Sequence, residues 1–170
     1  MTWPADAVAL VTERFGLTLC ETEGPMVSRD QVVQLAQALR DELDFTFFVY
    51  VVAVHYPEVP AVEADEEKDI AAADAVPDCT VVHYRLRRLA TAERATDTFA
   101  FRVTVPTGEE TPSVAHIWKG ADWQEREQFD LVGTIFSGHP DLRRIMMPED
   151  WPGHPLRRDY AIDTSHFPWR

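Results

Sequence analysis

The apolar positions at the start of the chain repeat with the period of an α-helix. Val8, Val11 and Phe15 recur every three or four residues, so residues 4–15 are predicted to form an amphipathic helix. A short apolar run follows at residues 17–23, where we predict a strand. The chain therefore begins with a helix that packs one side on a core.

A second helix is predicted over residues 28–43. Ser28 precedes Gln31 by three residues, which is the spacing of a capping box at the start of a helix. The apolar positions of this segment share one helical face, and they are Val32, Leu35, Leu39 and Leu43. Both helices thus offer a single apolar side, as helices that cover one side of a sheet do.

The middle of the chain has the pattern of a sheet. Residues 45–56 are apolar at almost every position, which indicates a central strand covered on both faces. Residues 80–89 and 97–105 alternate instead, and this predicts a β-hairpin with one polar face. The two sides of its first strand are Val82, Tyr84 and Leu86 against His83, Arg85 and Arg87.

A third helix follows a short helical piece that is predicted at residues 114–118. Asp122 precedes Glu125 by three residues, which is a second capping-box spacing. The helix is predicted to run to about Val132 and to end at Gly133, since glycine commonly terminates helices.

Residues 134–170 fit neither a helix nor a strand. Two Gly-His-Pro triplets interrupt them, at 138–140 and 153–155, and a pair of arginines follows each triplet. Proline breaks both kinds of regular structure, yet the segment is too aromatic to be an ordinary disordered tail. We therefore predict an extended tail that runs across a surface, its own or a partner's, with arginine–carboxylate pairs fixing its register.

The predicted fold class is α+β. Residues 1–133 are expected to form a globular domain with a small mixed sheet and helices packed on one side, and residues 134–170 a long, extended, partner-docking tail. On the third helix, Glu125, Glu127 and Asp130 are expected to be exposed carboxylates that pair with arginines of the tail or of a partner.

The charge of the chain excludes some classes of partner. The 170 residues carry a net charge of −13, which disfavours nucleic acid and anionic membrane surfaces. Eight acids and one lysine lie in residues 58–78, which are expected to form a solvated acidic loop rather than a docking arm. No apolar run is long enough to span a bilayer, and no signal-peptide pattern begins the chain, so we expect a cytoplasmic location.

The candidate chemistry is sparse. Cys20 and Cys79 are far apart in sequence and are expected to be buried free thiols rather than metal ligands. The six histidines form no metal-binding pair on a helix, and His139 and His154 are expected to be hydrogen-bonded structural residues. A hydrolase or lyase that uses His139 with nearby carboxylates is the alternative enzymatic hypothesis. No phosphate-binding loop or nucleophile elbow is present in the sequence.

The region from Trp123 to Tyr160 closely resembles the signature of the C subunit of NADH-quinone oxidoreductase, the respiratory complex I. The resemblance rests on Glu-Arg-Glu-Gln-Phe-Asp-Leu at 125–131, Gly-His-Pro-Asp-Leu-Arg-Arg-Ile at 138–145, and Gly-His-Pro-Leu-Arg-Arg-Asp-Tyr at 153–160. It continues more loosely through the hairpin and the long apolar strand. A motif of this length is much more specific than a short pattern.

The resemblance implies a non-catalytic assembly subunit in the hydrophilic arm of a proton-pumping complex, on the cytoplasmic side of the bacterial inner membrane. It implies no catalytic, cofactor-binding or metal residue in this chain, while the complex uses FMN, iron–sulfur clusters and a quinone. The implied partners are chiefly the quinone-site subunit (D) and the terminal-cluster subunit (B). The alternative is the equivalent scaffold subunit of a related membrane-bound hydrogenase or other complex-I-like dehydrogenase.

The residues expected at the partner interface lie on the third helix and the tail. They are Glu125, Arg126, Glu127, Asp130, Gly138, His139, Pro140, Asp141, Arg143, Arg144, Trp151, His154, Arg157, Arg158 and Tyr160.

Overall fold

The first helix of the computed structural model lies where the sequence predicts it. The structure describes residues 3–20, 22–61, 74–92 and 94–161. Helix α1 spans Ala5–Ala9 and continues as a π-helical segment, Leu10–Arg14. Ala7 and Val11 are fully buried, which confirms the amphipathic helix.

The strand predicted at residues 17–23 is wrong for the residues that the structure describes there. Strand β1 is instead the pair Met26–Val27, which lies parallel to β4 (Asp97–Pro106). Gly24 gives the reason, because its φ is +75° and a Cβ there would lie 2.0 Å from the carbonyl oxygen of Ala100. The chain turns tightly against β4 at this glycine, and pairing begins only after it.

Helix α2 spans Val32–Asp41 and follows a 3-10 turn, Arg29–Gln31. The predicted capping box differs in detail, because the Ser28 hydroxyl donates to the side-chain oxygen of Gln31 at 2.9 Å and makes no bond to the helix backbone. The buried positions of α2 nevertheless follow the predicted face, and they are Val32, Leu35, Ala36, Ala38 and Leu39.

The main sheet of the described chain is mixed and has the strand order β1-β4-β3-β2. Strand β2 spans Phe47–Tyr56 and pairs antiparallel with β3 (Cys79–Arg88), which pairs antiparallel with β4. The mixed sheet is therefore confirmed. The prediction of a central position for the apolar strand is wrong, because β2 lies at an edge and its burial alternates.

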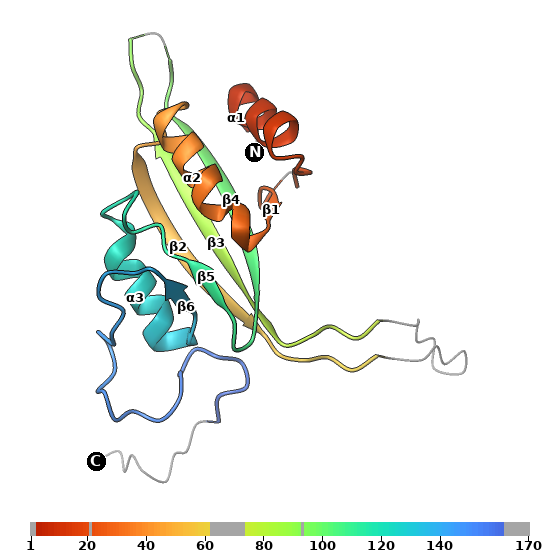
Figure 1. The fold of residues 1–170 in the computed structure, drawn as a ribbon, viewed down its shortest axis with the longest axis vertical. Helices are drawn as coiled ribbons and strands as arrows, with labels where there is room; N and C mark the ends of the chain where they lie inside the picture. Colours follow the sequence, from red (N-terminus) through yellow and green to blue (C-terminus); the bar gives the residue numbers. More distant parts are fainter. Residues whose placement is uncertain (1–2, 21, 62–73, 93, 162–170) are drawn as a thin grey trace.

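Helix α3 (Ala121–Val132) covers the free edge of β2 (Figure 1). The side-chain oxygens of Gln124 and Gln128 accept the backbone N–H groups of Val51 at 2.9 Å and Ala53 at 3.0 Å. Residues four apart on a helix share a face, so the two glutamines reach the strand together. The edge of β2 is thus satisfied by side chains in place of another strand.

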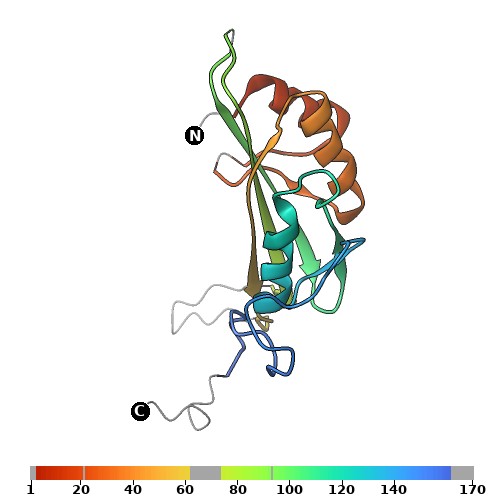
Figure 2. The same ribbon diagram turned by 90° about the vertical axis from the view of Figure 1, so that its left-hand side faces the viewer.

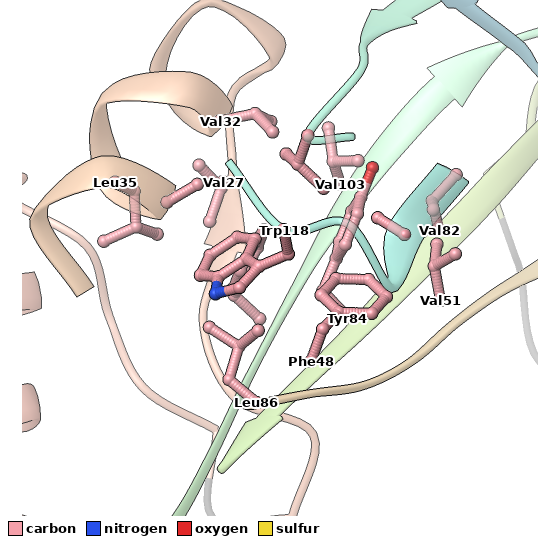
Figure 3. Close-up of a cluster of buried hydrophobic side chains, with 14 of the residues drawn as sticks. Val27, Val32, Leu35, Phe48, Val51, Val82, Tyr84, Leu86, Val103 and Trp118 are labelled. Atoms are coloured by element: carbon pink, nitrogen blue, oxygen red, sulfur yellow. The ribbon is translucent and has the colours of Figure 1, made fainter. Parts of the chain in front are cut away.

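Helices α1 and α2 pack on the same face of the sheet, as predicted (Figures 1 and 2). Tyr84 and Leu86 of β3 point into this core with Trp118 (Figure 3), and all three are almost completely buried. The Tyr84 ring stacks on Phe101 of β4, with centroids 4.7 Å apart. The alternation predicted for the hairpin is therefore confirmed.

The segment before α3 differs from its prediction. Residues 114–118 form one turn, in which the amides of Ile117 and Trp118 both donate to the Val114 carbonyl at 2.9 Å. Helix α3 begins after Gly120, so Asp122 lies inside the first turn and is no cap. Gly133 ends the helix in a left-handed conformation, as predicted.

Two short strands connect α3 to the rest of the domain. Strand β5 (Glu110–Pro112) lies parallel to β6 (Ile135–Ser137), which follows directly after the helix. The free thiol of Cys79 is buried as predicted, whereas Cys20 is only half-buried. In the described part of the chain, no helix is both long enough and apolar enough to cross a bilayer. Residues 62–73 of the predicted acidic loop lie outside the described residues.

The glutamine contacts to β2 lead to a stability prediction. Replacing Gln128 by Leu leaves the buried N–H of Ala53 without an acceptor, so we expect the free energy of unfolding to fall by about 1–3 kcal/mol. Urea denaturation of the purified chain measures this. Glu127→Leu, at the half-exposed neighbouring position, serves as the control, and an equal loss in both variants would contradict the role of Gln128.

Candidate subunit interface

The tail folds back on the chain's own surface. After β6, residues 138–161 contain no helix or strand and run beside α3 to the end of β2 (Figure 1). The sequence predicts a tail that lies either on the chain's own surface or on a partner's. In the structure, the described part of the tail lies on the chain's own surface. Residues 162–170 of the predicted tail lie outside the described residues.

Asp130 of α3 is the main anchor of this tail. One oxygen of its carboxylate accepts three consecutive backbone N–H groups, those of Ile145 at 3.0 Å, Met146 at 2.6 Å and Met147 at 2.9 Å. A guanidinium nitrogen of Arg144 lies 3.4 Å from the other oxygen. Asp130 is completely buried, so its predicted exposure is wrong, while its predicted pairing with a tail arginine is correct.

The surroundings of Asp130 keep it ionised. Burial alone raises the pKa of this carboxyl, but the three amides and Arg144 outweigh burial and hold the pKa below its usual range. A depressed carboxyl pKa contributes stability above the unfolded-state value of 3.8, and this stability is lost as the pH falls through the folded-state pKa. The tail is therefore held at neutral pH and weakened in acid.

The two Gly-His-Pro triplets bind opposite ends of α3. The Nε2 of His139 lies 3.1 Å from the carbonyl oxygen of Asp122, while its Nδ1 accepts the N–H of Asp141 at 3.0 Å. The Nδ1 of His154 lies 2.9 Å from the carbonyl oxygen of Asp130. Each imidazole thus donates to a helix carbonyl. Both histidines are hydrogen-bonded structural residues, as predicted.

The second triplet also completes the end of the helix. The N–H of Leu156 donates to the carbonyl of Leu131 at 2.8 Å, beside the bond from His154. These carbonyls have no partner inside the helix, so the tail supplies their donors. Gly133 leaves room for this contact, because a Cβ there would lie 2.7 Å from the ring of His154.

Glu125 is buried and not exposed as predicted. Its carboxyl accepts the hydroxyl of Ser113 at 2.5 Å and the N–H of Val114 at 2.8 Å, and the Nε2 of His139 lies 3.9 Å away. Burial raises the pKa of Glu125 to about 7, against the opposing effect of these two donors. Glu125 therefore connects α3 to the turn before it, and the predicted partner role is not available to its side chain.

The two arginines that follow the first Gly-His-Pro triplet, and Arg126 of α3 beside them, have different roles. Arg144 points inward, donating to the carbonyl of Gly153 at 3.0 Å besides its contact with Asp130. Arg143 is exposed and pairs with Asp141 at 2.9 Å. Arg126 of α3 is buried, with a nitrogen 3.7 Å from Asp141.

The second arginine pair closes the tail on the end of β2. Arg157 lies 2.8 Å from the Nε2 of His55 and 3.5 Å from the carboxylate of Asp78, and the N–H of Arg158 donates to the Nδ1 of His55 at 3.2 Å. His55 is buried and contacts Asp78 at 2.6 Å. The sequence alone does not identify His55 and Asp78 as site residues. The available signal is that His55 lies at the end of an apolar strand and Asp78 directly before the next strand.

His55, Asp78 and Asp159 bring three potential metal ligands within 4.8 Å of one another. The guanidinium of Arg157 already supplies a cation to this group, because it also binds Asp159 at 2.9 Å. This pairing holds the pKa of Asp159 below its usual range. The arrangement is that of an arginine-centred ion cluster, and it disfavours a metal ion in the same space.

The remaining predicted interface residues lie on the same tail or on α3. Trp151 and Tyr160 are half-buried, as is Glu127 on α3, whereas Gly138, Pro140 and Arg158 are exposed. Most of the predicted set is thus brought together around α3 and the end of β2. Several of these side chains already make hydrogen bonds or ion pairs within the chain.

Three comparisons place the chain among known proteins. The family described as "Respiratory-chain NADH dehydrogenase, 30 Kd subunit" matches residues 25–166. A protein of Mycolicibacterium gilvum (strain PYR-GCK), named as the C subunit of NADH-quinone oxidoreductase, is 40% identical, over 80% of this chain and 53% of its own length. One of the same name from Nocardioides sp. (strain ATCC BAA-499 / JS614) is 34% identical, over 93% of this chain and 60% of its own length.

A solved structure shares the fold. It is that of the trypsin-resistant fragment (1–134) of Nqo5, and it matches with a TM-score of 0.59 at 24% identity, covering 81% of this chain and 98% of the fragment. At this identity the likeness concerns the fold alone. The chain spans 53% and 60% of the lengths of the two relatives above, so it corresponds to part of such proteins.

The tail anchor can be tested with Asp130→Ala. Three amides then lose their acceptor and the half-buried guanidinium of Arg144 loses its ion-pair partner, so we expect the free energy that keeps residues 144–147 closed to fall by roughly 3 kcal/mol. Hydrogen exchange of the amides of Ile145, Met146 and Met147 measures this. Glu149→Ala is the control, because this carboxylate of the same tail is exposed. Unchanged exchange in Asp130→Ala would contradict the anchor.

The raised pKa of Glu125 predicts a pH-dependent stability. The unfolded carboxyl titrates near 4.5 and the folded one near 7, so between these values the folded state binds more protons. Stability therefore decreases as the pH rises through this window. Glu125→Gln removes the titration, and we expect its unfolding midpoint in urea to fall less than that of the original chain between pH 5 and pH 8.

Glu127→Gln is the matched control for this measurement, because it changes a half-exposed carboxyl two residues away. Parallel pH dependences of the Glu125→Gln variant and the original chain would exclude the proposed role of Glu125.

Proposed function

Because the chain belongs to the family of the respiratory-chain NADH dehydrogenase 30 Kd subunit, we propose that it is a structural subunit of a proton-pumping NADH:quinone oxidoreductase. The observation that carries the proposal is the extent of the match. It begins at residue 25, before β1, and continues to residue 166, past the second Gly-His-Pro triplet. The family match thus includes both the sheet and the tail that folds over α3.

The chain is proposed to have no active site of its own. Its strongest catalytic candidates are engaged in structural contacts: His139 with α3, His154 with the helix end, and Glu125 with Ser113. A general base must reach a substrate proton, and these groups instead bind the backbone or side chains of the same chain. The hypothesis of a hydrolase that uses His139 is therefore disfavoured.

The chemistry of the complex is assigned in this proposal to other subunits. FMN, iron–sulfur clusters and a quinone would be bound there, and this chain would support the quinone-site subunit (D) and the terminal-cluster subunit (B). The complex would place the chain on the cytoplasmic side of the bacterial membrane, as a peripheral subunit. The two bacterial relatives carry the name of an NADH-quinone oxidoreductase component, which supports this complex over a hydrogenase relative.

The outer side of the tail and α3 suits a partner interface. Trp123 of α3 and Leu156 of the tail are 66% and 62% exposed, and Met146 and the side chain of Arg143 are also exposed. Exposed aromatic, methionine and arginine side chains are enriched at protein interfaces. The inner side of the tail is held by Asp130 and His55, so the outer side is presented in a fixed shape.

The tail carries two exposed arginines, Arg143 and Arg158, at which trypsin cleaves when the backbone is accessible. We propose that trypsin cleaves the free chain first in its tail, after the exposed Arg143 or Arg158, and that partner subunits protect these bonds.

Co-purification tests the proposed function. A tagged chain, purified from detergent-solubilised membranes of its native cells, is expected to recover the other subunits together with NADH:quinone reductase activity. The double variant Arg143→Glu/Leu156→Glu is expected to lower that recovery about tenfold or more, because both side chains face outward. Mass spectrometry and activity of the eluate measure the result.

Leu89→Glu is the control for this experiment, since Leu89 is comparably exposed but lies just after β3, at the opposite end of the molecule from the tail (Figure 1). A chain that elutes alone, or one that turns over a substrate by itself, would overturn the proposal.

A further inference from the structure

The outer face of the sheet carries an apolar column along β2. The core-facing residues of this strand alternate with outward-facing ones. The outward-facing residues are Phe47, Tyr50, Val52, Val54 and Tyr56. Phe47 is 49% exposed, Val52 41% and Tyr56 37%. A contiguous row of large apolar side chains on a surface marks an interaction site more often than scattered single residues do.

A basic column lies directly beside it on β3. In the register of the sheet, Phe47 is opposite Arg87, Tyr50 opposite Arg85 and Val52 opposite His83. Neither strand contains an aspartate or a glutamate, although the chain as a whole carries 29 of them and a net charge of −13. We call these two columns the β2–β3 outer face. It is an apolar and basic surface on an acidic protein.

Within the described residues, no helix covers this face. Helices α1 and α2 lie on the opposite side of the sheet, as Figure 2 shows. The segment before β1 lies instead against the neighbouring strand, where Gly24 contacts Ala100 and Glu23 pairs with Arg102 of β4. Phe47, Val52 and Tyr56 of β2 thus remain exposed, as does Arg87 of β3, while His83 and Arg85 of the same strand are half-buried.

The tail ends at this same face. The guanidinium of Arg158 lies over the ring of Tyr56, 5.0 Å from its centroid, and Arg157 contacts His55 next to it. The outer side of the tail and the β2–β3 outer face are therefore continuous around the end of β2. A partner that binds the tail has an unbroken path onto the sheet.

We propose that the β2–β3 outer face is a docking surface for an acidic protein partner, a neighbouring subunit that meets it with apolar side chains surrounded by aspartate and glutamate. The proposal rests on the proposed function, because the same partner is taken to bind the tail. Apolar contact with the β2 column supplies the buried area, and carboxylates opposite the exposed Arg87 supply charge complementarity. A second copy of this chain is a poor occupant, because two chains of charge −13 repel each other.

Variants of the full chain in the purified complex test the surface. Val52→Glu and Arg87→Glu are each expected to lower the recovery of partner subunits about tenfold, and Arg87→Ala less than Arg87→Glu, since reversal adds repulsion to the loss of attraction. Leu89→Glu is the matched control, an exposed apolar position beyond the end of β3. The far-ultraviolet circular dichroism and melting temperature of each purified chain are expected to stay unchanged.

A photo-crosslinking residue at position 52, in the assembled complex, identifies the occupant without relying on loss of binding. We expect a crosslink to another subunit, through a peptide rich in aspartate or glutamate. A crosslink to a second copy of this chain, to lipid, or to no protein would overturn the proposal. A crosslinker at position 156 separates the two hypotheses. If position 156 crosslinks and position 52 does not, the proposed function stands and the sheet surface fails.

Discussion

The buried carboxylate of Asp130 is the interaction on which the described tail depends. A buried charge is tolerated only when donors surround it, and here three consecutive amides and one guanidinium do so. This contact fixes the middle of a segment whose prolines prevent any regular structure. The histidines of the two triplets then fix its two sides at the ends of α3. An irregular chain thereby acquires one defined shape.

Helix α3 holds other parts of the domain by hydrogen bonds, as it holds the tail. Its glutamines satisfy the edge of β2, its buried Glu125 holds the turn before it, and its last carbonyls bind the tail. A helix with so many buried polar side chains has little apolar stripe, so its packing is specified by hydrogen bonds. The sheet edge, the turn and the tail are consequently all hydrogen-bonded to the same helix.

The features that depend on local residue spacing are predicted correctly from the sequence. The predictions of burial are wrong where a segment distant in sequence covers the residue. The alternation of His83 and Arg85 against Tyr84 and the end of α3 at Gly133 follow from local rules, and both are correct. The sequence predicts Glu125 and Asp130 at the surface, because nothing near them in sequence indicates that a loop and a tail cover them, and both are fully buried. The apolar run of β2 suggested a central strand, whereas its outward residues leave one face open. The resemblance in residues 123–160 supplied the family, which spacing alone did not.

The capping of α3 by the tail has a consequence for how the chain is made. Residues 145–156 leave the ribosome after the helix does, so the carbonyls of Asp130 and Leu131 and the carboxylate of Asp130 wait for donors that emerge later. Until then the helix end must stay in contact with water. The helix can bury its polar groups only when the tail has been synthesised, and a nascent chain truncated before Met147 would leave the domain unfinished.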